Sequence, residues 1–154
     1  QYFEVGKASD DQSKADSIGM VYKASANTSI EGKAKDFLYV VQIDKFNSPD
    51  SDHFCFVYEE DQTGNILGYV EAEAYESIYS DPGLNVLGLA VFPSAQGCGI
   101  GRQLMERIEA LAQTHKYGFI RLSSASHRKE AHVFYERIGY EGNRTQKRFL
   151  KIMD

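Results

Sequence analysis

A glycine-rich turn between an apolar run and a long amphipathic pattern restricts the fold of this chain more than any other feature. Its sequence is Gln96-Gly97-Cys98-Gly99-Ile100-Gly101, with three glycines in five positions. The apolar residues 84–91 before it are too few for a membrane helix and typical of a buried strand. The helical stripe after it consists of Ile100, Leu104, Ile108 and Leu111 and ends near residues 116–118. The sequence therefore predicts a strand, a turn and a helix, with uncovered backbone N–H groups suited to an anion.

The spacing of the glycines limits which anion this turn can hold. A dinucleotide-binding turn needs Gly-x-Gly-x-x-Gly, but Arg102 and Leu104 stand where the third glycine would be. The Gly-Lys-Ser/Thr of a Walker-type loop is also absent. The remaining Gln-x-x-Gly-x-Gly pattern surrounds a helix N-terminus with amides and suits a pyrophosphate. A turn that only joins strand to helix is the alternative, and three glycines favour binding over it.

The rest of the chain predicts a mixed α/β domain. Before the turn we expect a strand at residues 2–5, helices at 10–23 and from Thr28 into the mid-forties, a loop at 47–52, a hairpin of strands 53–59 and 66–75, and a surface loop at 76–83. After it we expect a strand at 119–123, parallel to residues 84–91, and a helix capped by Ser126 that ends before Gly139. Its inner face would carry Ala131, Phe134, Tyr135 and Ile138. The tail should add one or two antiparallel strands anchored by Phe149, Leu150 and Ile152.

Composition indicates a single domain over residues 1–154, because 154 residues with 42% hydrophobic residues form one sizeable core. A net charge of -5 argues against nucleic acid as the main partner. Only Cys55 and Cys98 are present, which favours reduced thiols over a disulfide framework. There is no membrane-length apolar stretch or signal-peptide core, so we expect a cytoplasmic protein without a membrane partner.

Two segments together carry a resemblance to a known family. Val91-x-Pro93-x-x-Gln96-Gly97-x-Gly99-Ile100-Gly101 resembles the acetyl-CoA-binding motif of the GNAT superfamily of N-acetyltransferases. Ala131-x-x-Phe134-Tyr135-x-x-x-Gly139-Tyr140 is similar to the second conserved segment of that family. The resemblance covers about residues 84–141. It implies a GNAT fold whose central mixed sheet splays at the cofactor cleft.

The resemblance also implies how acetyl-CoA is held. Backbone amides would bind its pyrophosphate at Gln96, Gly97, Cys98, Gly99, Ile100, Gly101 and Arg102. Pantetheine would pair like an extra strand along Leu89, Ala90 and Val91. Arg128 replaces an asparagine that contacts the cofactor in many members of the family. It either reaches a coenzyme A phosphate or is exposed in the first turn of its helix.

Catalysis needs a proton donor for the leaving thiolate and an acceptor for the amine proton. Tyr135 matches a tyrosine that GNAT enzymes often place beside the sulfur, and a phenol with a pKa of about 10 can protonate it. The same spacing also fits a core aromatic residue. Glu73 is the first candidate for the base and Glu71 the second, since both share one face of a strand. The loop carboxylates that remain open as alternatives are Asp61, Glu76 and Asp81.

Other chemistry has weaker support. His127 and His132 are five positions apart and do not share a helix face, and no Cys/His group has metal spacing. Cys98 lacks a spaced His partner for nucleophilic catalysis. The aromatic segment 75–79 either receives a cationic amine or packs on its own domain.

We therefore expect an acetyl-CoA-dependent N-acetyltransferase that moves acetyl to a primary amine, on a small molecule or a peptide, by direct attack in a ternary complex. A catalytically silent acyl-CoA-binding sensor is the alternative, favoured by the lack of a carboxylate in residues 84–91 and opposed by Tyr135. Pairing of two chains through an exposed C-terminal strand is a further hypothesis.

Overall fold

The computed structural model describes residues 2–4, 52–60, 62–63 and 65–154. The chain divides into two compact units, Gln1–Leu122 and Ser123–Asp154, each of which is described by itself. The helices expected at 10–23 and from Thr28, and all but the last residue of the loop 47–52, lie outside the described residues. The expectation of a single domain over residues 1–154 stays a prediction.

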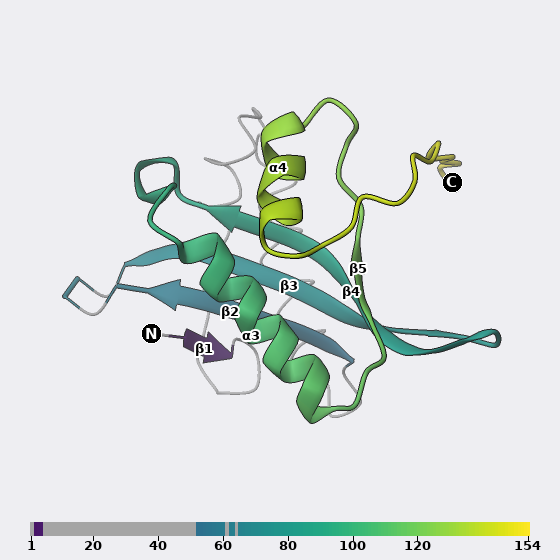
Figure 1. Cartoon of the computed structure of the whole chain (residues 1–154), viewed down its shortest axis with the longest axis horizontal. Helices are drawn as coiled ribbons and strands as arrows, with labels where there is room; N and C mark the ends of the chain where they lie inside the picture. Colours follow the sequence, from purple (N-terminus) through teal and green to yellow (C-terminus); the bar gives the residue numbers. More distant parts are fainter. Residues whose placement is uncertain (1, 5–51, 61, 64) are drawn as a thin grey trace. The chain divides into compact units, whose positions relative to one another are not determined.

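The described residues of the first unit form a five-stranded sheet whose strands are adjacent in chain order (Figure 1). The strands are β1 (Tyr2–Glu4), β2 (His53–Glu59), β3 (Ile66–Ser77), β4 (Ser80–Val91) and β5 (Ile120–Leu122). β4 and β5 are parallel, and the other neighbouring pairs are antiparallel. The predicted hairpin and the predicted parallel pair are therefore confirmed, and the fold class is mixed α/β.

Helix α3 (Ile100–Thr114) lies across one face of β2, β3 and β4 and connects β4 to β5 (Figure 1). Its buried side chains are Ile100, Leu104, Met105, Ile108 and Ala112. Ile100, Leu104 and Ile108 are buried as predicted, whereas the predicted Leu111 is half-buried. Met105 and Ala112 are buried in addition. The helix ends through Lys116, whose φ of 57° is left-handed, so the nearby Gly118 does not supply the left-handed residue.

Gly68 allows α3 to approach β3 closely. A Cβ atom at this position would lie 2.9 Å from the Ala90 carbonyl oxygen and 3.2 Å from Ile100 Cγ2. We expect Gly68→Ala to lower the free energy of unfolding by about 1–3 kcal/mol, because either β4 or α3 has to move. Thermal denaturation should show a Tm lower by roughly 2–12 °C. In the control Gly142→Ala, the new Cβ would be 3.5 Å from Glu136 Oε1, an ordinary contact. Equal Tm values for the two variants would contradict this account.

The prediction of a surface loop at residues 76–83 is wrong. β3 continues to Ser77 and β4 begins at Ser80, so Ile78 and Tyr79 alone form the turn of a long hairpin. The two strands extend past β2 and β5 as a two-stranded ribbon (Figure 1). Ser77 pairs with Ser80 in the register, and their hydroxyl oxygens lie 2.8 Å apart.

The second unit contains α4 (Lys129–Arg137) and a tail that has neither helix nor strand. The predicted cap at Ser126 is wrong, because the Arg128 amide donates to the Ala125 carbonyl and closes a separate turn before the helix. Arg128 itself precedes the helix and makes no side-chain cap. Gly139 has a φ of 99° and ends the helix as expected.

The prediction of one or two C-terminal strands is also wrong, since residues 139–154 are described and contain no strand. The expected anchors Phe149, Leu150 and Ile152 are 89%, 69% and 82% exposed. Phe149 and Leu150 are adjacent and would point to opposite faces of a strand, so the tail lacks one apolar face. Pairing of two chains through a strand here loses its structural support.

Candidate active site

The glycine turn connects β4 to α3 through the short 3-10 helix η1 (Pro93–Ala95). Gly97 and Gly99 both have a φ of 80°, the left-handed region that favours glycine, and Gly99 immediately precedes the helix. The Gln96 side chain donates from Nε2 to the Val91 carbonyl oxygen at 3.1 Å and closes the turn onto the end of β4. The backbone conformation thus explains two of the three glycines.

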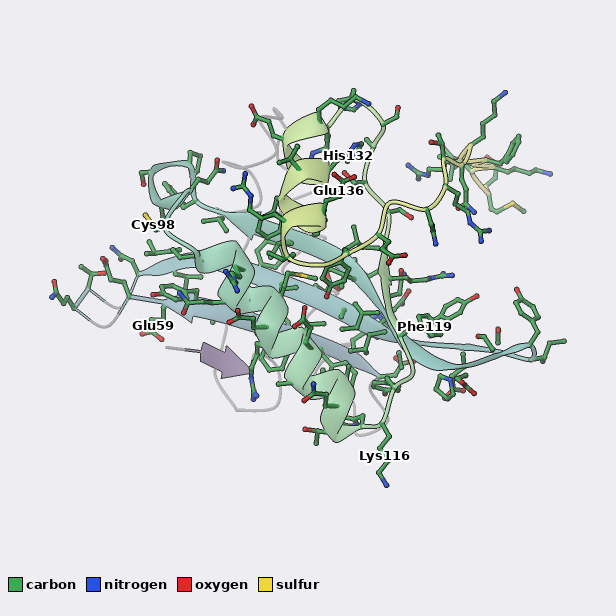
Figure 2. The ribbon with its side chains drawn as sticks, viewed as in Figure 1. Glu59, Cys98, Lys116, Phe119, His132 and Glu136 are labelled. Carbon is green, nitrogen blue, oxygen red and sulfur yellow. The ribbon has the colours of Figure 1, made fainter. Side chains whose placement is uncertain are left out.

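Consecutive amides at this turn remain open. Among the described residues, no backbone carbonyl accepts a hydrogen bond from the amides of residues 97–102, and the first helical bond runs from the Gln103 amide to the Gly99 oxygen at 3.1 Å. The first turn of α3 has no acidic side chain and no side-chain cap. Cys98 is exposed at the turn (Figure 2). The N-terminus of α3 therefore presents donors and a partial positive charge to an anion.

One edge of β4 is open next to this turn. β5 pairs with β4 only at Leu84, Asn85 and Val86. Within the described part of the first unit, residues 87–91 have no β5 residue opposite them. This stretch includes the predicted pantetheine segment, in which Ala90 is buried and Leu89 and Val91 are half-buried. The predicted divergence of the two strands is therefore present in the register.

A β-bulge lies where the open edge begins. Glu71 pairs with Gly88 and Ala72 pairs with Val86, so Leu87 is an extra residue on β4. Leu87 is 46% exposed, so the predicted strand at residues 84–91 is present but is not buried along its whole length. A bulge bends its strand and frees backbone groups from the ladder.

The two candidate bases on β3 have different surroundings. Glu71 is 9% exposed and lies opposite Cys55 on β2. Burial, together with the nearby Glu71 carboxylate, raises the pKa of the Cys55 thiol well above its usual value. The Glu73 side chain is 34% exposed. Only Glu73 thus combines partial exposure with the polar contacts that follow.

A row of polar side chains, His53, Glu73, Asn85 and Arg121, crosses the sheet from β2 to β5. The Asn85 amide nitrogen donates to Glu73 Oε1 at 3.2 Å, and His53 Nε2 lies 3.4 Å from Glu73 Oε2. His53 Nδ1 lies 3.0 Å from Asp52 Oδ1. Arg121 donates from Nε to Asn85 Oδ1 at 3.4 Å. We call these four residues the polar row.

Sequence reasoning missed the polar row, because its members are far apart in the chain and only the sheet register brings them together. The one available signal was the predicted hairpin, in which His53 comes to lie opposite Glu73. Arg121 also changes the expectation for the aromatic segment, since its Cζ lies 3.6 Å from the centre of the Tyr75 ring. Tyr75 also contacts Phe119 near the ribbon (Figure 2), and the centres of the two rings are 5.9 Å apart. Tyr75 thus receives a cation, but the cation belongs to the protein.

Comparison with known proteins decides the family. Residues 51–142 match the family model described as the acetyltransferase (GNAT) domain, which is more than half of the chain. The chain belongs to the GNAT acetyltransferases. Members of this family use acetyl-CoA as the acetyl donor.

A curated relative and several solved structures are similar to this GNAT chain. Rat N-acetylaspartate synthetase is 31% identical over 77 residues, which are 50% of this chain and 25% of that protein. The chain therefore spans only about a quarter of that relative's length.

Two solved structures share the fold at low identity. An aminoglycoside acetyltransferase from an uncultured soil metagenomic sample, in complex with sisomicin, has a TM-score of 0.83 at 15% identity, over 100% of this chain and 96% of that one. The structure of AAC(6')-Iy with the bisubstrate analogue CoA-S-monomethyl-acetylneamine has a TM-score of 0.79 at 13% identity, over 99% and 98% of the two chains.

Tyr135, in the second GNAT segment, lies on α4 in the second unit and is half-buried. Burial raises the pKa of its phenol, while the positive charge of Arg128 acts in the opposite direction. Its ring lies edge-on to the rings of Phe134 and Tyr140, at 5.1 Å and 6.2 Å between centres. Arg128 is exposed at the start of the helix. The phenol therefore stays protonated to a higher pH than an ordinary tyrosine.

The two histidines of the second unit have separate surroundings. His132 Nε2 lies 3.0 Å from the Ala125 carbonyl oxygen, and His127 is exposed. In the part of the chain that the structure describes, no group of three or more His, Cys, Asp or Glu side chains could hold a metal ion. The described helices include none that is long and apolar enough to cross a membrane.

Proposed function

We propose that this GNAT chain transfers acetyl from acetyl-CoA to a primary amine by direct attack in a ternary complex. The amine nitrogen forms a bond to the thioester carbonyl carbon, the carbon–sulfur bond breaks, and an amide and free coenzyme A result. The observation that carries the proposal is the open run of amides at residues 97–102 beside the open edge of β4. Such an arrangement serves a ligand that has both a pyrophosphate and an extended amide-containing arm.

The donor site in this proposal uses backbone groups. The amides from Gly97 to Arg102 bind the pyrophosphate, and the pantetheine arm pairs with residues 89–91 of β4. The Gln96 amide, also expected in this cradle, instead donates to the Pro93 carbonyl oxygen at 3.4 Å. Arg128 adds a charge contact to a coenzyme A phosphate. The bulge at Leu87 supports a further role, because an amide freed from the ladder can donate to the thioester oxygen as negative charge develops on it.

Glu73 receives the amine proton in this mechanism. An alkylammonium has a pKa of about 10.4 and no lone pair, so at neutral pH it has to lose a proton before its nitrogen can attack. Glu73 accepts that proton, and the proton that the nitrogen loses once its bond to carbon has formed leaves by the same route. The Asn85 amide fixes one oxygen of Glu73, and His53 offers a route from the other oxygen to Asp52.

Tyr135 supplies the proton that the departing sulfur needs. Its raised pKa supports this role, because the phenol remains a donor through the neutral and mildly alkaline range. The atoms balance: the ammonium loses two protons through Glu73, Tyr135 gives one proton to the thiolate of coenzyme A and regains one from solvent, and one proton is released in total.

Glu73→Gln should lower kcat/KM about a hundredfold at neutral pH, because the amide cannot accept the proton. The loss should lessen as the pH approaches 10, where a growing share of the amine is already neutral. Steady-state rates measured across pH for Glu73→Gln, Glu71→Gln and the exposed control Glu141→Gln test this. A larger loss of kcat/KM in Glu71→Gln than in Glu73→Gln would make Glu71 the first candidate for the base. A pH–rate profile that is unchanged in Glu73→Gln would rule out Glu73 as the base.

Thiol release from acetyl-CoA, followed with amines of several classes, tests the activity itself. The panel should include aminoglycosides, amino acids, polyamines and peptides, since the names of similar proteins point to aminoglycosides and to an N-acetylated amino acid. Acetyl-CoA binding without thiol release from any of them would favour a sensor.

Free Cys55 and Cys98 thiols support a reducing, cytoplasmic setting. One catalytic domain over residues 1–154 is part of this proposal, and the family match over residues 51–142, which spans parts of both units, supports it for that range.

A further inference from the structure

Arg121 is the cationic end of the polar row and is held from two sides. Its Nε donates to Asn85, and its guanidinium covers the Tyr75 ring. The side chain is nevertheless exposed. Among the described residues, the ion pairs join His53 to Asp52 and Glu73, and Arg102 to Glu106, so none includes Arg121. The two terminal nitrogens of a guanidinium held in this way can take a carboxylate in the forked geometry that arginine favours.

Glu73 lies on the same row with the Asn85 side chain between it and Arg121. The Asn85 amide binds both: its nitrogen donates to Glu73 and its oxygen accepts from Arg121. One amide group and two hydrogen bonds, of 3.2 and 3.4 Å, thus separate the Glu73 carboxylate from the Arg121 guanidinium. A free amino acid has a comparable make-up, with its ammonium and its carboxylate attached to one carbon and a hydrogen bond of about 2.9 Å at each end.

We propose that the acceptor is an aminocarboxylate, an amine that also carries a carboxylate, such as a free amino acid. Arg121 binds the carboxylate and thereby directs the amine toward Glu73. This inference rests on the proposed acetyl transfer. It fits the position of the row, because Asn85 is two residues from the bulge at Leu87, about 7 Å along β4. A polycation would place a second ammonium against Arg121 and be repelled.

The test compares each amino acid with its methyl ester and its decarboxylated amine, for example phenylalanine, its ester and phenethylamine. In the unmodified protein, kcat/KM should be about tenfold or more higher for the acid than for the ester. Arg121→Gln should erase this preference by raising KM for the acid while leaving the ester unchanged. Arg121→Lys should keep part of it, because lysine retains the charge but not the fork. Arg144→Gln, an exposed arginine outside the elements, is the matched control.

The possible results separate this inference from the proposed function. Equal values for acid and ester, an equal loss for both in Arg121→Gln, or faster turnover of polyamines and aminoglycosides would overturn the aminocarboxylate and leave acetyl transfer standing. No thiol release from any amine, with acetyl-CoA bound, would overturn the transfer and this inference with it. If Arg121→Gln does not fold, the acid-to-ester ratios of the unmodified protein and of Arg121→Lys give the decision.

Discussion

Tyr135→Phe is expected to lower kcat about a hundredfold while leaving the KM for acetyl-CoA nearly unchanged, because general-acid assistance to the leaving thiolate is lost and the backbone cradle is intact. The unmodified protein should also lose activity as pH rises through the phenol's pKa. Burial raises that pKa, so this alkaline limb should lie above the ordinary tyrosine value of about 10. Steady-state kinetics from pH 7 upward measure both effects.

Tyr140→Phe is the matched control for this prediction. Tyr140 is a second half-buried tyrosine of the same unit, and its ring contacts that of Tyr135. Its hydroxyl has no part in the proposed mechanism, so its loss should change kcat far less. A normal kcat in Tyr135→Phe at saturating substrates would show that Tyr135 is a packing residue, and the proton for the sulfur would then come from water.

The sequence predicted those parts of the fold whose local chemistry is unambiguous. His53–Glu59 was placed correctly because turn residues border an apolar run, and α3 begins at Ile100 because glycines precede an amphipathic stripe. The ribbon was missed, since Pro82 and Gly83 are typical of a loop. Pro82 instead lies at an edge, before β5 pairs with β4 at Leu84, and Gly83 makes room for the Phe119 ring.

Some residues of the candidate site could likewise be predicted from the sequence, and others could not. A backbone anion site depends on a contiguous run of residues, so the glycine turn could be read from its spacing. The polar row depends on the register of four strands, and no local pattern marks Arg121 as a partner of Asn85. Glu73 was a candidate from its strand position alone, and its partial exposure and its contacts with His53 and Asn85 became known only from the structure.

Gly99→Val is expected to raise the KM and the Kd for acetyl-CoA about a hundredfold, because hydrogen bonds from amides to a charged group contribute roughly 1.5–3 kcal/mol each. The weaker binding would result from the backbone conformation at residue 99 and not from a steric clash of the new side chain. A Cβ at Gly99 would have its nearest neighbour, Gln103 Nε2, at 4.0 Å, but a φ of 80° is very unfavourable for a β-branched residue. The turn would have to rearrange, and its amides would no longer converge.

A graded set of variants isolates this cause. Gly99→Asn should raise the Kd much less than Gly99→Val, since asparagine tolerates the left-handed region. Cys98→Ala should leave it nearly unchanged, because the Cys98 side chain is exposed and only its amide faces the anion in the proposed cradle. Calorimetric titration with coenzyme A gives the Kd without turnover, and thermal denaturation gives the cost to the fold, about 1–2 kcal/mol for the strained residue. If Gly99→Val binds coenzyme A as well as Cys98→Ala does, the pyrophosphate is held by side chains such as Arg102 or Arg128, and the backbone cradle is wrong.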